Sequence, residues 1–97
     1  MSVTAVTRLH ATAGQEATLV ELMTEGRRRM IGAEGCESFD TLRDQSDHRS
    51  FAFVQTWTSR EAHDAAFGKL ILGSGHLDKV LAVLDESVSQ AFYERIS

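Results

Sequence analysis

The junction between one strand and the helix after it constrains this chain more than any other feature. Residues Phe51–Trp57 read Phe-Ala-Phe-Val-Gln-Thr-Trp, and their alternation predicts a β-strand. One predicted face carries Phe51, Phe53, Gln55 and Trp57, and the other carries Ala52, Val54 and Thr56. Thr58 or Ser59 can cap a helix that begins at once, and Glu61 completes a possible capping box from Thr58. The junction therefore sets the register of a short α+β domain.

Hydrophobic periodicity predicts three more strands and two more helices along the chain. The other predicted strands are Val3–Ala11, Cys36–Arg43 and Val88–Ile96, and the predicted helices are Gln15–Ile31, Ser59–Phe67 and His76–Asp85. The polar run Asp44–His48 predicts a turn that joins the second and third strands in a hairpin. The segment Gly68–Gly75 has an apolar centre between glycines, so helix, loop and lid all remain open for it.

The resulting order, β-α-β-β-α-β, is typical of a ferredoxin-like α+β sandwich with an antiparallel sheet. With 97 residues and no linker, the chain is expected to form a single domain over residues 1–97. Helices cover one sheet face in such a fold, and the other face must be polar or paired. Because both faces of Phe51–Trp57 carry apolar side chains, the sequence predicts a homodimer.

Charge and composition exclude several classes of partner. The formal net charge of −4 argues against binding nucleic acid, and Arg27–Arg29 is interpreted as a basic helix end that complements the helix dipole. No segment has the length and hydrophobicity of a membrane span or a signal peptide, so no membrane partner is expected. Cys36 is the only cysteine, which rules out an internal disulfide and favours a reducing, cytoplasmic location.

The histidines do not predict a metal centre. His10, His48, His63 and His76 lack the close spacing of metal ligands. His63 is expected on a solvated helix face beside Asp64. No serine lies in a nucleophile-elbow motif, and the glycines do not form a phosphate-binding loop.

Short motifs on this layout resemble the antibiotic biosynthesis monooxygenase family, whose members are small dimeric α+β barrels. The matching residues are Gly35-Cys36 with Phe39 shortly after, Trp57 at the strand end, and Ser59-Arg-Glu-Ala62 opening the helix. With the first strand and helix, the resemblance covers nearly the whole chain. It implies a dimeric α+β barrel built from the ferredoxin-like unit.

Family members that oxidise polyketide or quinol-type aromatics need no metal or flavin, because the electron-rich substrate itself reduces oxygen. The resemblance therefore implies a cofactor-independent monooxygenase with an apolar pocket between sheet and helices. The residues implied to be catalytic are His76, Thr7 and Trp57, and those implied to bind the ring are Phe39, Phe53 and Phe67. His76 would accept a proton, because a position at a helix N-terminus favours the neutral imidazole.

Two alternatives from different classes remain open. A haem-degrading branch of the same family places an iron-ligating histidine at the position of His76, a tryptophan at Ala66 and an asparagine at Thr7. This chain keeps one of these three residues, so haem binding or degradation through His76 is the first alternative. The second is a dimer that binds a hydrophobic ligand without turnover. The residues alone also permit His76 to be a surface residue and Trp57 to be a core residue.

Overall fold

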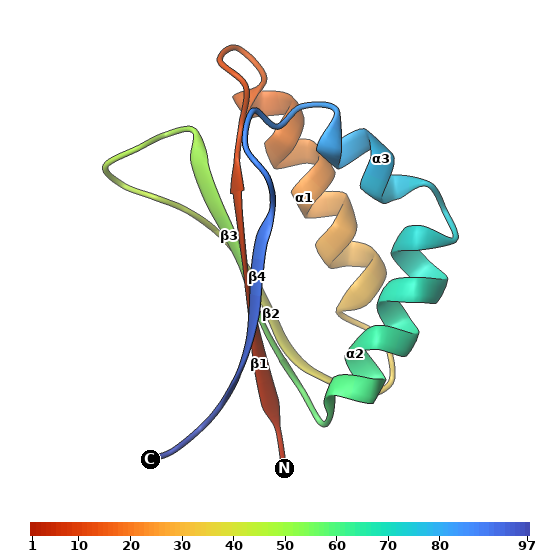
Figure 1. Cartoon of the computed structure of the whole chain (residues 1–97). Coiled ribbons are helices and arrows are strands. Elements are labelled where there is room, and N and C mark those ends of the chain that lie inside the picture. The colour runs from red at the N-terminus through yellow and green to blue at the C-terminus, as the bar shows by residue number, and fades with distance from the viewer.

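Two layers make up the computed structural model, which describes residues 1–97: an antiparallel sheet and a set of helices on one of its faces (Figure 1). In chain order the elements are β1 (Val3–His10), α1 (Glu16–Met30), β2 (Cys36–Arg43), β3 (Ser50–Trp57), α2 (Arg60–Ala66), the π-helix η1 (Phe67–Leu72), α3 (His76–Leu81) and β4 (Ser89–Glu94). The sheet order is β2-β3-β1-β4, and every neighbouring pair is antiparallel. This is the ferredoxin-like arrangement, so the predicted fold is confirmed.

The predicted strand faces are also confirmed. In β1, Ala5, Thr7 and Leu9 are buried beneath the helices, and in β3, Phe51, Gln55 and Trp57 are buried on the same side. The buried side chains form two clusters. One surrounds Leu19 and Met23 of α1 with Leu9 and Phe51, and the other surrounds Met30, Phe39 and Trp57. Together they attach α1 and α2 to the sheet.

The strand–helix junction differs from its prediction in one detail. Ser59 is the cap of α2, and its Oγ accepts a hydrogen bond of 3.1 Å from the backbone N–H of Ala62. The N–H of Thr58 instead donates to the carbonyl of Gly35 at 2.8 Å, so the capping box from Thr58 to Glu61 is wrong. Gly35 has φ +90°, and a Cβ there would lie 2.7 Å from Cβ of Ala62, so only glycine fits this turn.

The segment after α2 is helical. The N–H of Gly73 donates to the carbonyl of Gly68 at 3.0 Å, which is the spacing of a π-helix. η1 thus continues α2 without a break and ends in a turn whose last residue, Gly75, has φ +75°. The question that the sequence left open for Gly68–Gly75 is resolved in favour of helix and turn.

The helix α3 is shorter than predicted because the chain after it bonds to the end of β1. The N–H of Thr12 donates to the carbonyl of Val83 at 2.9 Å, and the N–H of Asp85 donates to the carbonyl of His10 at 3.1 Å. These bonds hold residues 83–85 against the end of β1, and the helix stops at Leu81 rather than Asp85. They also direct the chain into β4.

The second face of the sheet has no helix over it (Figure 1). Val6 and Val54 pair across β1 and β3 on this face, and Leu42 and Tyr93 on the edge strands are about half exposed. An apolar strip therefore crosses the open face. No helix of the protein has both the length and the apolar character needed to cross a membrane.

Candidate active site

A cavity of about 90 Å³ lies between the helices and the covered sheet face. Its lining residues come from all four strands, from α1, α2, η1 and α3, and from the segment before β4: Thr7, Leu9, Gly26, Met30, Phe39, Phe53, Gln55, His63, Phe67, Ile71, His76, Leu77, Val80, Val88 and Gln90. Apolar side chains dominate, with a few polar groups among them. This composition is typical of a small-molecule site.

Five of the six residues implied by the family resemblance line this cavity. Phe39 and Phe53 meet edge to face, with ring centroids 5.3 Å apart, and Phe67 lies on the opposite side in η1. Thr7 and His76 also line it. Trp57 does not, so direct contact between its side chain and a ligand in this cavity is not supported.

Trp57 instead orients Gln55, a cavity-lining residue that the sequence did not single out. The indole is fully buried, and its Nε1–H donates to Oε1 of Gln55 at 2.8 Å. Because an indole N–H can only donate, this bond fixes which end of the Gln55 amide is the oxygen. The NH₂ group of Gln55 has no partner within the chain, and Gln55 lines the cavity. The sequence signal that could have identified Gln55 is its place as a polar residue on the apolar face of the predicted strand.

His76 is buried at the first residue of α3, so the interpretation as a surface residue is wrong. Its Nε2 lies 2.9 Å from the carbonyl oxygen of Leu22. A carbonyl only accepts, so Nε2 carries the hydrogen and Nδ1 of the neutral ring keeps a lone pair. The ring packs beside Gly26 of α1, where a Cβ would lie 3.4 Å from Nε2, at the near limit of ordinary van der Waals contact.

Thr7 contributes a hydroxyl with no partner. The residue is 8% exposed, and its Oγ1 is enclosed without any hydrogen bond. A buried polar atom in this condition costs free energy, of the order of 1–3 kcal/mol. A hydrogen-bonding ligand in the cavity would remove that cost.

His63 is the clearest correction to the sequence-based prediction. It is 3% exposed instead of solvated, and it lines the cavity. Its Nδ1 lies 2.9 Å from Oδ1 of Asp64, whereas its Nε2 is enclosed without a partner. The missed signal was helical spacing, because His63, Ala66 and Phe67 lie three and four residues apart and share the inner face of the helix.

The lining residues do not fit haem. A cavity of about 90 Å³ is far smaller than the roughly 300–1,000 Å³ of ordinary ligand pockets. Nε2 of His76 is bonded to a carbonyl, and the residue at position 66 is a buried alanine. The geometry thus gives no support to the haem alternative.

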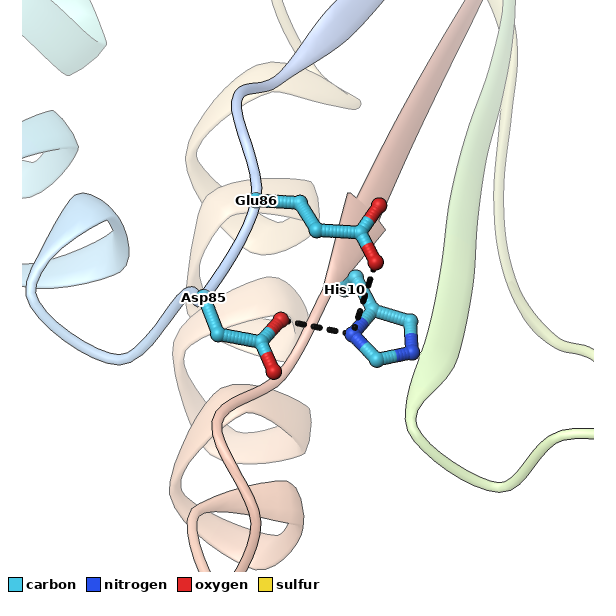
Figure 2. Close-up of side chains that lie close together, drawn as sticks. All are labelled: His10, Asp85 and Glu86. Carbon is cyan, nitrogen blue, oxygen red and sulfur yellow. Dashed lines mark hydrogen bonds and ion pairs between the residues drawn. The ribbon is translucent and has the colours of Figure 1, made fainter.

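A second polar cluster lies outside the cavity, at the end of β1. Nδ1 of His10 lies 2.6 Å from Asp85 and 3.4 Å from Glu86 (Figure 2). Its Nε2 lies 3.1 Å from Asp47 in the loop between β2 and β3. Arg49 from the same loop also pairs with Asp85. Because His10 and Arg49 already supply positive charge, we interpret this cluster as an ion-pair network that joins three segments.

The network predicts a pH-dependent stability. The hydrogen bond to Asp85 raises the pKa of His10 above 6.5, and the same bond lowers the pKa of Asp85 below 3.8. Protonated His10 therefore stabilises the fold fully below pH 6.5, and this contribution disappears as the pH rises through its raised pKa. The contribution of Asp85 is present above pH 3.8 and disappears as the pH falls through its lowered pKa.

Thermal denaturation of the wild type and His10→Gln measures this effect. The melting temperature of the wild type should exceed that of His10→Gln most at mildly acidic pH, and the difference should shrink above neutral pH. His48→Gln, in an exposed part of the same loop, is the matched control and should show no such trend. A difference that grows with pH would contradict the assigned ion pairs.

Comparisons with known proteins identify a matching family and solved structures with a similar fold. The chain matches the family model described as antibiotic biosynthesis monooxygenase over residues 2–69. Rv0793 from Mycobacterium tuberculosis superposes with a TM-score of 0.89 at 16% identity, covering 100% of this chain and 97% of that one. SnoaB, a cofactor-independent oxygenase from Streptomyces nogalater, superposes with a TM-score of 0.85 at 17% identity. The match covers 99% of this chain and 94% of SnoaB.

At these identities the two structures establish a shared fold, and their chemistry does not transfer with it. No curated protein sequence gives a significant match. The family match covers more than half of the chain and includes β1, α1, the β2–β3 hairpin and α2. This protein therefore belongs to the antibiotic biosynthesis monooxygenase family.

Proposed function

We propose that this protein is a cofactor-independent monooxygenase that oxidises a small aromatic or quinol-like substrate with molecular oxygen. The observation that carries the proposal is an apolar cavity lined by two residues, Thr7 and His63, that each have an enclosed polar atom without a partner. Membership of the family supports the reaction class. The description of SnoaB as cofactor-independent supports the absence of a resident redox group.

A quinol can supply every electron that the reaction needs. One hydroquinone and one O₂ give one hydroxyquinone and one water, so one oxygen atom enters the ring and the other leaves as water. The ring loses two hydrogens and gains one oxygen, which together account for all four electrons that O₂ accepts. No external reductant is required. The protein then has to bind the ring, remove a hydroxyl proton and stabilise the oxyanion.

The lining residues divide these tasks between them. The rings of Phe39, Phe53 and Phe67 hold the aromatic substrate. The lone pair on Nδ1 of His76 accepts a hydroxyl proton, which leaves the electron pair on the substrate oxygen. The hydroxyl of Thr7 donates to that oxyanion. Trp57 acts indirectly, because it keeps the donor end of the Gln55 amide free.

Binding requires the cavity to widen. An apolar protein cavity of roughly 150 Å³ binds benzene, and this one measures about 90 Å³. Phe67 and Ile71 form one wall and belong to η1, which is only six residues long and is followed by Gly73 and Gly75. Outward movement of η1 is therefore the opening step that we infer.

The open sheet face is the proposed homodimer interface. Val6, Val54, Leu42 and Tyr93 lie on this face, and a second copy of the chain would bury them. Sedimentation equilibrium should give twice the 10.7 kDa mass of the chain. A monomeric mass at micromolar concentration would contradict this assembly.

An oxygen electrode tests the proposed reaction. Purified protein, freed of metals by chelation and checked for flavin and haem by absorbance, is mixed with a series of substituted hydroquinones. We expect saturable oxygen uptake of one O₂ per quinol, with no oxygen returned by catalase. Simple autoxidation would instead produce hydrogen peroxide, which catalase reveals. Binding of quinols without oxygen uptake would identify a ligand-binding dimer in place of an enzyme.

A further inference from the structure

We propose that His63, oriented by Asp64, is a second proton acceptor in the cavity, and that the substrate consequently carries two hydroxyl groups. The inference rests on the proposed function, because it concerns the same cavity, but it adds a catalytic residue and narrows the substrate class. Its starting point is that the two enclosed polar side-chain atoms without partners, Nε2 of His63 and Oγ1 of Thr7, belong to residues lining one cavity.

The hydrogen-bond partner of His63 fixes its tautomer. Oδ1 of Asp64 lies 2.9 Å from Nδ1, and a carboxylate accepts, so Nδ1 carries the hydrogen. Nε2 of the neutral ring is then a lone pair enclosed within the protein. The group that this atom lacks is a hydrogen-bond donor, and among small aromatic ligands a phenolic hydroxyl supplies one.

Three aromatic rings hold the imidazole of His63 in place. It stacks on Phe67 with centroids 5.8 Å apart, and it meets Trp57 and Phe92 edge to face at 5.6 and 5.0 Å. The direction of its Nε2 lone pair is therefore set by packing as well as by Asp64. A residue needed only for this packing could be phenylalanine, which would leave no polar atom unsatisfied.

The carboxylate that accepts from Nδ1 of His63 also contacts a surface cation. Arg60 is 4.0 Å from the other oxygen of Asp64 and lies over Phe92, with its guanidinium carbon 4.1 Å from the centroid of that ring. Asp64 thus connects the buried histidine to solvent-exposed charge.

Two lone pairs in one cavity match the stoichiometry of quinol oxidation. His63 takes the proton of one hydroxyl and His76 takes the proton of the other, and each electron pair stays on its oxygen. The resulting quinolate gives its electrons to O₂. The two imidazolium protons then pass to the reduced oxygen atom that leaves as water. A phenol with one hydroxyl uses only one acceptor, so it should be the poorer substrate.

Two hydroquinones of different acidity separate a proton acceptor from a structural residue. One is unsubstituted, and the other is a fluorinated hydroquinone whose hydroxyl is already ionised at the assay pH. We expect His63→Gln to lower kcat with hydroquinone about 10²-fold and with the fluorinated quinol less than tenfold. The kcat of Asp64→Asn with hydroquinone should lie between that of wild type and that of His63→Gln. The kcat of His48→Gln should equal that of wild type. Equal losses with both quinols, or no loss with either, would overturn the proposal.

A binding measurement separates failure of this inference from failure of the proposed function. 4-Nitrophenol is not a substrate, and its absorption distinguishes the phenol from the phenolate. The measurement is made with His76→Ala, which lacks the other acceptor, at a pH where free 4-nitrophenol is protonated. His76→Ala should bind it as phenolate, and the double variant His76→Ala/His63→Phe, which preserves the packing around position 63, should bind it as phenol. This outcome would support His63 as acceptor even if no quinol consumed oxygen. Equal phenolate signals in the single and the double variant would overturn the proposal whether or not the protein is an oxygenase.

Discussion

Replacement of Trp57 by alanine should lower the free energy of unfolding by about 3–5 kcal/mol, the usual cost of truncating a large buried aromatic residue. Trp57 has no exposed surface and packs in the cluster that includes Met30 and Phe39. The truncation leaves a void beneath α2 and deprives Oε1 of Gln55 of its donor. In a domain of this size, each kcal/mol of lost stability lowers the melting temperature by about 4 °C or more. The melting temperature of Trp57→Ala should therefore fall by about 12 °C or more.

Trp57→Phe separates the packing role from the positioning role. It keeps a large ring but removes the indole N–H, so it should destabilise the fold by about 1–3 kcal/mol. The amide of Gln55 is then free to turn, and quinol turnover should fall although the ring packing is largely kept. Calorimetry and oxygen uptake on both variants measure the two effects. A melting temperature for Trp57→Ala within a few degrees of wild type would contradict the assigned burial.

The largest expected effect on activity is that of His76→Ala, which should lower kcat about 10²-fold or more if Nδ1 accepts a substrate proton. The same change removes the hydrogen bond from Nε2 to Leu22, which costs about 1 kcal/mol, and leaves a void where the buried ring packed. A loss of stability greater than that of the bond alone should therefore accompany the large loss of turnover. Oxygen uptake with hydroquinone, measured well below the melting temperature, tests this.

Added imidazole is the control for His76→Ala. The truncation enlarges the cavity beside Gly26, so a free imidazole can occupy the vacated space. It should restore part of the turnover of His76→Ala and leave the wild-type rate unchanged. Full turnover by His76→Ala without imidazole would remove His76 from the mechanism.

Local sequence pattern was sufficient to predict the strands and their faces. The alternation in Phe51–Trp57 identified which side chains face the helices, because a strand has only two faces. Helix ends were harder to predict. The true end of α3 depends on backbone bonds from Val83 and Asp85 to the end of β1, which are contacts between distant parts of the chain.

The lining of the candidate site was predicted in part, and what was missed depends on contacts that only the folded chain makes. Thr7 and His76 line the cavity as the family resemblance implied, but the burial of His63 depends on Phe67 and Phe92, which the fold brings together from η1 and β4. The polar neighbour Asp64 favoured a solvated position for His63. The bond from Trp57 to Gln55 was likewise invisible in the sequence, because residues two apart on a strand reveal a shared face but not a hydrogen bond.

Oxygenation of a quinol in this cavity without a cofactor is tested most directly by isotope labelling. Metal-free, flavin-free protein is incubated with hydroquinone under ¹⁸O₂, and the product is analysed by mass spectrometry, with His76→Ala treated in parallel. We predict a hydroxyquinone that carries one ¹⁸O atom, formed by wild type far faster than by His76→Ala. Plain benzoquinone without ¹⁸O, formed equally fast in both samples, would contradict the proposed function.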